Sequence, residues 1–128
     1  MSIRRRRFCG GAGAPMHARR AVRETLGGAL SRRALGDVEL LVSELATNSV
    51  RHAGCGEQDE LGIEAAVDDD RVRVRLCDGG YGFEAGAPEK PDVAQAGGFG
   101  LVLLDRLADA WGVQRGDRFC VWFELERG

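Results

Sequence analysis

The sequence has no long apolar run, no CxxC cysteine pair and a single lysine, and each absence excludes a class of protein. No stretch approaches the roughly 18 consecutive apolar residues of a membrane-spanning helix, which excludes a membrane span. The first residues lead into the arginine run 4–7 without an apolar segment, so we expect no secretion signal and a cytoplasmic location. The net charge of −2 argues against bulk nucleic-acid binding. Lys90 is the single candidate for a mechanism that needs an active-site lysine.

Metal-binding residues are also few. The sequence contains only two histidines, and its four cysteines are isolated from one another: Cys9, Cys55, Cys77 and Cys120. A zinc site needs clustered ligands, so we do not expect one. Spacing alone leaves a disulfide open, but nothing marks the chain as secreted. The prediction is therefore four buried, reduced thiols in a cytosolic protein.

The 128 residues, with 44% hydrophobic and 30% charged side chains, predict one folded domain. Apolar periodicity predicts helices from residue 15, over 35–53 and over 100–110, and strands over 60–67, 71–76 and 119–125, with a short strand from 111. This order favours an α+β fold, with one sheet covered on one face. We expect residues 1–14 to be a basic, frayed segment with a short strand at Phe8 and Cys9, and 15–128 to be the domain. An arginine run can also contact nucleic acid or an acidic partner.

Glycine is abundant, with 19 residues that cluster at 10–13, 79–86 and 97–100. Such clusters are either slack linkers or backbone that must approach something closely. The segment 79–99 is a long loop with little periodicity, which is typical of a functional or mobile segment. The three aspartates at 68–70 fit a solvated hairpin tip better than a cation site.

The first candidate for chemistry is the pair Glu44 and Asn48 on the second predicted helix. Residues four apart project from the same side of a helix, here beside the apolar stripe. An asparagine oxygen suits Mg²⁺, and a glutamate one turn earlier can take a proton from a hydroxyl near that metal. An intrahelical or capping interaction is the alternative for this pair.

Two glycine-rich strings follow. Asp78 ends a predicted strand and opens the first string, which continues with Gly80, Gly82 and Phe83. A carboxylate at this position can accept a hydrogen bond from the amino group of adenine. The alternative is an ordinary turn. The second string leads straight into a helix, whose free N–H groups form a cradle for anions: Gly97, Gly98, Phe99, Gly100 and Leu101. It lacks the lysine of a Walker loop and the preceding strand of a dinucleotide fingerprint.

In this order the three motifs resemble the N box and the two glycine boxes of the GHKL, or Bergerat-fold, ATP-binding superfamily. The sequence is most similar to stand-alone anti-sigma-factor serine/threonine kinases and their actinobacterial ATP-binding relatives, over about residues 8–125. The resemblance implies a two-layer α/β sandwich with a mixed, mostly antiparallel sheet, three helices on one face and an ATP lid. It implies ATP and Mg²⁺ as ligands, and a sigma factor or an antagonist protein as partner, with a homodimer as one option.

The resemblance also implies residue roles. Asn48 would hold Mg²⁺ through the phosphates, Glu44 would activate the attacking hydroxyl, and Asp78 would receive adenine. Gly80, Gly82 and Phe83 would shape the base pocket, and 97–101 would cradle the phosphates. One departure is Gln95-Ala96, where some kinases of the group carry a cation before the second glycine box. A non-catalytic, ATP-gated protein-binding module therefore stays open as the alternative. Trp111 and Trp122 are interpreted as packing residues, and His52 as a core or helix-end residue.

Overall fold

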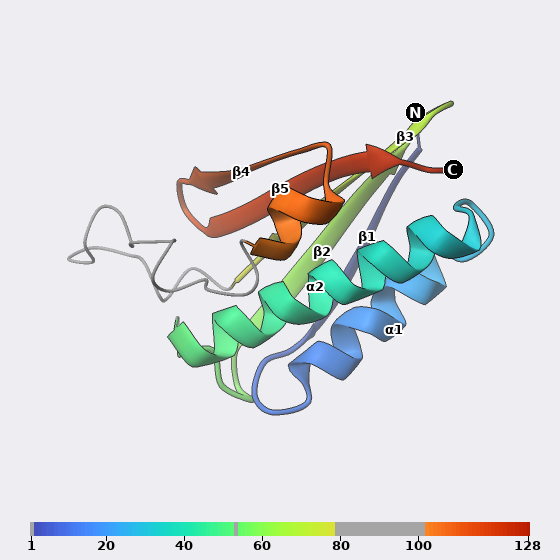
Figure 1. The fold of residues 1–128 in the computed structure, drawn as a ribbon. Helices are drawn as coiled ribbons and strands as arrows, with labels where there is room; N and C mark the ends of the chain where they lie inside the picture. The colour runs from blue at the N-terminus through green and yellow to red at the C-terminus, as the bar shows by residue number, and fades with distance from the viewer. Residues whose placement is uncertain (1, 53, 79–101) are drawn as a thin grey trace.

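The computed structural model describes residues 2–52, 54–78 and 102–128. Its five strands form one sheet in the order β1-β2-β3-β5-β4, and all four neighbouring pairs are antiparallel. Figure 1 shows α1 and α2 lying side by side across one face of this sheet. The predicted α+β class with a sheet covered on one face is confirmed. No helix of the described part is long and apolar enough to cross a membrane.

The helices form where the apolar periodicity predicts them. Helix α1 spans Ala14–Leu26 with Pro15 in its first turn, and α2 spans Arg32–His52. Each helix buries one stripe of apolar residues. The fully buried residues include Ala18, Val22 and Leu26 in α1 and Val38, Leu41 and Val42 in α2. The stripes face the sheet and each other, which makes this layer the main hydrophobic core.

Strands β2 (Glu60–Val67), β3 (Arg71–Cys77) and β5 (Phe119–Glu126) alternate buried and more exposed residues along most of their length, because one sheet face packs on the helices. Strand β4 (Ala110–Arg115) pairs with β5 and is the last strand of the sheet that the described residues form. Residues 102–107 are helical, and the fully buried Leu104 joins them to the same core.

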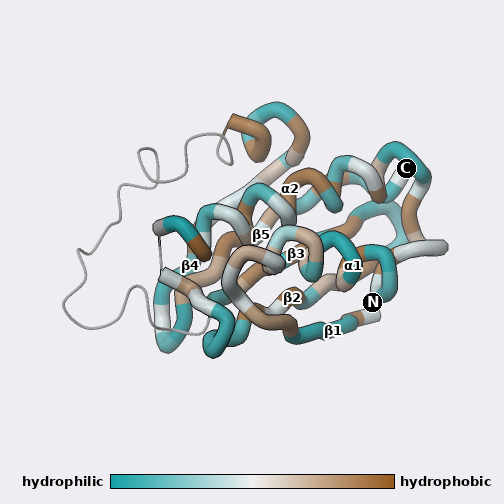
Figure 2. The backbone as a smooth tube through the Cα atoms, turned by 90° about the horizontal axis from the view of Figure 1, so that it is seen from below, coloured by the Kyte–Doolittle hydropathy of each residue, from teal (hydrophilic) through white to brown (hydrophobic). Residues whose placement is uncertain are grey.

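The N-terminal segment differs from the expectation of a frayed end. Residues Ser2–Cys9 form β1, which pairs with β2 along its whole length. The arginines alternate in direction: Arg4 donates to the Thr25 carbonyl of α1, whereas Arg5 pairs with Glu64, which points away from the helices. Figure 2 shows that β1 is mostly hydrophilic, so apolar alternation does not predict a strand over its whole length. The division of the chain at residue 15 stays a prediction.

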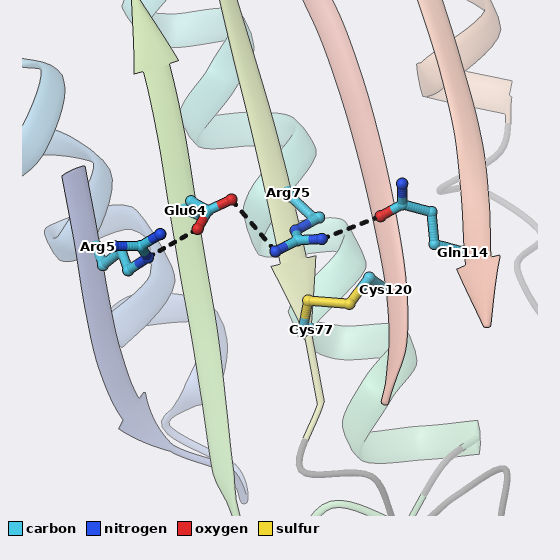
Figure 3. Close-up of a disulfide and its surroundings, with 6 residues drawn as sticks. All are labelled: Arg5, Glu64, Arg75, Cys77, Gln114 and Cys120. Carbon is cyan, nitrogen blue, oxygen red and sulfur yellow. Dashed lines mark hydrogen bonds and ion pairs between the residues drawn. A yellow bond between two sulfur atoms is a disulfide. The ribbon is translucent and has the colours of Figure 1, made fainter. Parts of the chain in front are cut away.

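The prediction of four buried, reduced thiols is wrong. Cys77 and Cys120 form a disulfide, Cys9 is exposed, and Cys55 is buried and outside the disulfide. The bonded residues are direct partners in the β3–β5 ladder, with Cα atoms 4.1 Å apart. Only the pairing of two strands distant in sequence brings these cysteines together (Figure 3).

Candidate nucleotide-binding site

Helix α2 places Glu44 and Asn48 one turn apart, and both side chains are half-buried. Leu41 and Leu45 beside them are nearly or fully buried, so the pair lies at the margin of the core, as the spacing predicts. The neighbouring Thr47 hydroxyl donates to the Ser43 carbonyl at 2.8 Å, within the helix. Glu44 and Asn48 are therefore the acid and amide that this part of α2 can present to a ligand.

Asp78 lies directly after the last residue of β3 and is only 2% exposed. Its backbone N–H donates to the Phe119 carbonyl at 3.1 Å, which extends the pairing with β5 by one residue beyond Cys77. A carboxylate buried at a strand end is suited to accept a hydrogen bond from an amine, since charge-assisted bonds are strong where water is excluded.

The fold brings α2 and Asp78 to the same end of the sheet. Helix α2 ends at His52, and residues 54–59 lead directly into β2. Near the start of β2, Gly62 pairs with Cys77, the neighbour of Asp78. Helix α2 also packs against β3 and β5. Figure 1 accordingly shows the C-terminal ends of α2 and β3 at one end of the molecule.

Two glycines at the end of β1 stabilise the connection after α2. The Gly10 and Gly11 N–H groups donate to the Asp59 and Cys55 carbonyls, each at 3.0 Å. A Cβ atom at Gly10 would lie 2.5 Å from the Gly56 carbonyl oxygen, so no larger residue fits there. Of the two interpretations of these glycines, close backbone approach is therefore correct for Gly10.

The other predicted site residues lie outside the described residues: Gly80, Gly82, Phe83, Gly97, Gly98, Phe99, Gly100 and Leu101. Their roles in the base pocket and phosphate cradle stay predictions. The structure describes the chain again from residue 102. There the Trp111 indole N–H donates to Asp105 at 2.8 Å and ties the helical residues 102–107 to β4. Trp111 is predicted from the sequence as a packing residue, and this bond was not predicted because its partner is six residues away in an adjoining element.

The donor chemistry of the described residues fits a magnesium nucleotide. Within the part of the chain that the structure describes, no three His, Cys, Asp or Glu residues are grouped for a metal. Asn48 and Glu44 offer oxygen atoms only, which Mg²⁺ prefers, and an ion there would complete its shell with phosphate oxygens and water.

The three aspartates at 68–70 form the predicted hairpin tip. The Asp68 carboxylate accepts the backbone N–H groups of Arg71 at 2.9 Å and Asp70 at 3.2 Å. The Arg71 hydrogen bond and then the Asp70 bond lower the pKa of Asp68 below its usual value of 3.8. The carboxylate therefore stabilises the turn between β2 and β3.

A family model described as the histidine kinase-like ATPase domain matches residues 14–124, and the chain belongs to this family. Among curated proteins it is similar to serine-protein kinases named RsbW. The protein of Listeria monocytogenes is 34% identical over 90 residues, covering 62% of this chain and 57% of the relative. That of Bacillus velezensis is 34% identical over 109 residues, covering 73% and 68%. That of Bacillus subtilis is 33% identical over 109 residues, with the same coverage.

Family membership implies that this domain binds ATP. The chain spans little more than half the length of the Listeria relatives, 57%. The superfamily resemblance drawn from the three motifs is thus confirmed, and so is a distant relationship to RsbW serine kinases. The narrower expectation of an actinobacterial type stays a prediction.

Proposed function

We propose that this protein is an ATP-dependent serine/threonine kinase that phosphorylates an antagonist protein and otherwise sequesters a sigma factor. The observation that carries the proposal is the placement of the half-buried Glu44 and Asn48 at the same end of the sheet as the buried Asp78. Membership of an ATPase family and similarity to proteins named serine-protein kinases support it. The protein would act in the cytoplasm.

In this proposal each described residue has one task. The Asp78 carboxylate accepts a hydrogen bond from the adenine amino group, which selects the base. The Asn48 side-chain oxygen binds Mg²⁺, which neutralises phosphate charge when the nucleotide is bound. The Glu44 carboxylate takes the proton from the serine or threonine hydroxyl of the partner protein. Catalysis consists mainly of positioning, since little covalent chemistry falls to the protein in phosphoryl transfer.

Transfer is tested by incubating the protein with Mg-ATP and its antagonist protein and measuring phosphoserine by mass spectrometry. We expect Glu44→Ala to abolish the signal while ATP binding persists. Glu39→Ala is the matched control, because Glu39 lies on the same helix and pairs with Arg23 at 3.9 Å. Equal phosphorylation by wild type and Glu44→Ala would remove Glu44 from the mechanism.

Nucleotide binding is tested separately by calorimetry. Asp78→Asn keeps the size of the side chain but loses its charge, and we expect it to weaken ATP binding at least about 100-fold, or about 2.7 kcal/mol. Asp117→Asn, in the exposed turn between β4 and β5, is the control. An unchanged affinity for ATP in Asp78→Asn would refute the adenine assignment.

The alternative function is an ATP-gated protein-binding module without transfer. It is favoured by Gln95-Ala96, which leaves no cation directly before Gly97. This function predicts partner capture that needs ATP but survives Glu44→Ala. Capture that is indifferent to ATP would exclude it.

A further inference from the structure

The sheet face opposite the helices carries a groove of about 620 Å³ with the Cys77–Cys120 disulfide in its lining. The groove lies beside this disulfide because one strand position there has no side chain. Across the sheet, the register aligns Gly62 of β2 with Cys77 of β3 and Cys120 of β5. The nearest atoms to a Cβ at Gly62 would be the Arg118 guanidinium and the Arg6 carbonyl oxygen, both 3.9 Å away. The bare position thus leaves space beside Cys77.

Arginine side chains surround this groove. Arg6 pairs with Glu24 at 3.7 Å and Arg7 pairs with Glu60 at 3.9 Å, and neither glutamate lines the groove. Four further arginines line it, namely Arg5, Arg75, Arg115 and Arg118. Among the described residues, two acidic residues line it with them, Glu64 and Asp117. The described lining therefore has an excess of two positive charges in a chain whose net charge is −2.

The remaining arginines form two groups. In the fixed row, ion pairs and hydrogen bonds hold the guanidinium groups, and in the available group no carboxylate of the described residues lies within 4.0 Å. Glu64 binds Arg5 at 2.7 Å and Arg75 at 3.2 Å, and Arg75 also donates to Gln114 at 3.2 Å. Figure 3 shows this row crossing the sheet beside the disulfide.

In the available group, no carboxylate of the described ranges lies within 4.0 Å of Arg115 or Arg118. The Arg115 guanidinium lies over the Phe119 ring, 5.7 Å from its centroid. These two guanidinium groups can bind an incoming anion.

We propose that this groove is a thiol–disulfide exchange site selective for small thiols that carry carboxylates, the chemical class of glutathione. The arginines attract the carboxylate of the thiol, and their positive potential stabilises a cysteine thiolate as the leaving group. Cys77 and Cys120 are each only 6% exposed, so attack on the disulfide requires a reagent small enough to enter the charged groove that it lines. Disulfides in reducing compartments are usually transient, and in this respect the proposal rests on the cytoplasmic location of the proposed function.

The reaction is a balanced exchange. The reagent thiolate attacks one cysteine Sγ, a mixed disulfide forms, the Cys77–Cys120 bond breaks, and the electron pair leaves on the other Sγ as a thiolate. A second reagent thiolate attacks the mixed disulfide and departs as the oxidised reagent. The protein gains two electrons and takes up two protons to become the dithiol, and the two small thiols supply the electrons.

The test compares three thiols of different charge on the folded, oxidised protein. Rates of reduction are measured for 3-mercaptopropionate, 2-mercaptoethanol and cysteamine, which are anionic, neutral and cationic. Each rate is expressed per thiolate and divided by the rate of the same thiol with bis(2-hydroxyethyl) disulfide, which removes differences in intrinsic reactivity. The protein carries Cys9→Ser, because Cys9 is an exposed free thiol.

Two excess charges at about 10 Å in water predict an advantage of about threefold for the anionic over the neutral thiol at 10 mM salt. The cationic thiol should be slower than the neutral one. At 0.5 M salt the advantage should fall below about 1.5-fold, because the Debye length shrinks. Equal normalised rates at low salt, or fastest reduction by cysteamine, would overturn the proposal.

Two variants locate the effect. Arg115→Gln with Arg118→Gln should abolish the advantage of the anionic thiol, whereas Arg33→Gln, on exposed α2 surface, should leave it unchanged. Gly62→Val fills the bare position and should slow all three thiols to a similar extent. Circular dichroism checks that each variant is folded. An undiminished charge preference without Arg115 and Arg118, or unchanged rates in Gly62→Val, would show that reagents reach the disulfide by another route.

Discussion

Reduction of the Cys77–Cys120 disulfide should lower the free energy of unfolding by about 4 kcal/mol. The bond joins residues 43 apart, and a closed loop of that length removes about 13 cal/mol/K of entropy from the unfolded chain. At 25 °C this entropy corresponds to about 4 kcal/mol. Domains of this size are stable by only about 5–15 kcal/mol, so the loss is a large share of the total.

The assay is urea unfolding followed by tryptophan fluorescence, with and without a reducing agent. With a slope of about 2 kcal/mol/M, the midpoint should fall by about 2 M on reduction. The double variant Cys77→Ala and Cys120→Ala should unfold near the reduced protein and should not respond to the reducing agent. Thiol titration of the denatured wild type should find two reduced thiols among the four cysteines, those of Cys9 and Cys55. Four reduced thiols, or identical midpoints with and without reductant, would refute this prediction.

Three further predictions concern the core, the open sheet face and pH. Leu104→Ala should lower the free energy of unfolding by about 3 kcal/mol in urea titrations, because Leu104 is fully buried. Gly112→Ala should cost about 1–2 kcal/mol, because its Cβ would lie 2.7 Å from the Trp122 indole. Asp68→Asn should destabilise the protein at about pH 6 but not in acid. The pKa of Asp68 is lowered in the folded state, so the charged carboxylate stabilises the fold above its ordinary pKa. This contribution disappears as the pH falls through the lowered pKa.

Each of these predictions has its own control or contrary result. Val102→Ala should have little effect, since Val102 is 48% exposed, and an equal loss at both positions would argue against burial as the cause. Gly116→Ala is the control for Gly112, because nothing lies within 4 Å of a Cβ there. For Asp68→Asn, a stability difference from wild type that persists to about pH 2 would mean that charge is not the cause.

Local patterns predicted most elements of the fold. The helices of residues 14–26 and 32–52 and the strands from 60 to 77 follow from apolar periodicity, because one face of each element must be buried. Of strand β1 only the end at Phe8 and Cys9 was predicted, because its four arginines show no apolar alternation. Its strand conformation depends on pairing with β2 and on the bonds from Arg4 and Arg6 to α1.

The candidate site was likewise predictable only in part. Glu44 and Asn48 could be placed on one helix face by their spacing alone, and Asp78 at a strand end by the alternation before it. The burial of Asp78 and its nearness to the end of α2 depend on pairings between residues distant in sequence, such as Gly62 with Cys77.

By itself the sequence determined the class of fold, the family and the order of the chemical motifs, because periodicity and short motifs are properties of neighbouring residues. Only the tertiary structure decided that Cys77 meets Cys120, and that Arg75, Arg115 and Arg118 line the same groove as that bond. The physical reason is strand register: it sets which distant side chains share one face of the sheet, and no local pattern records it.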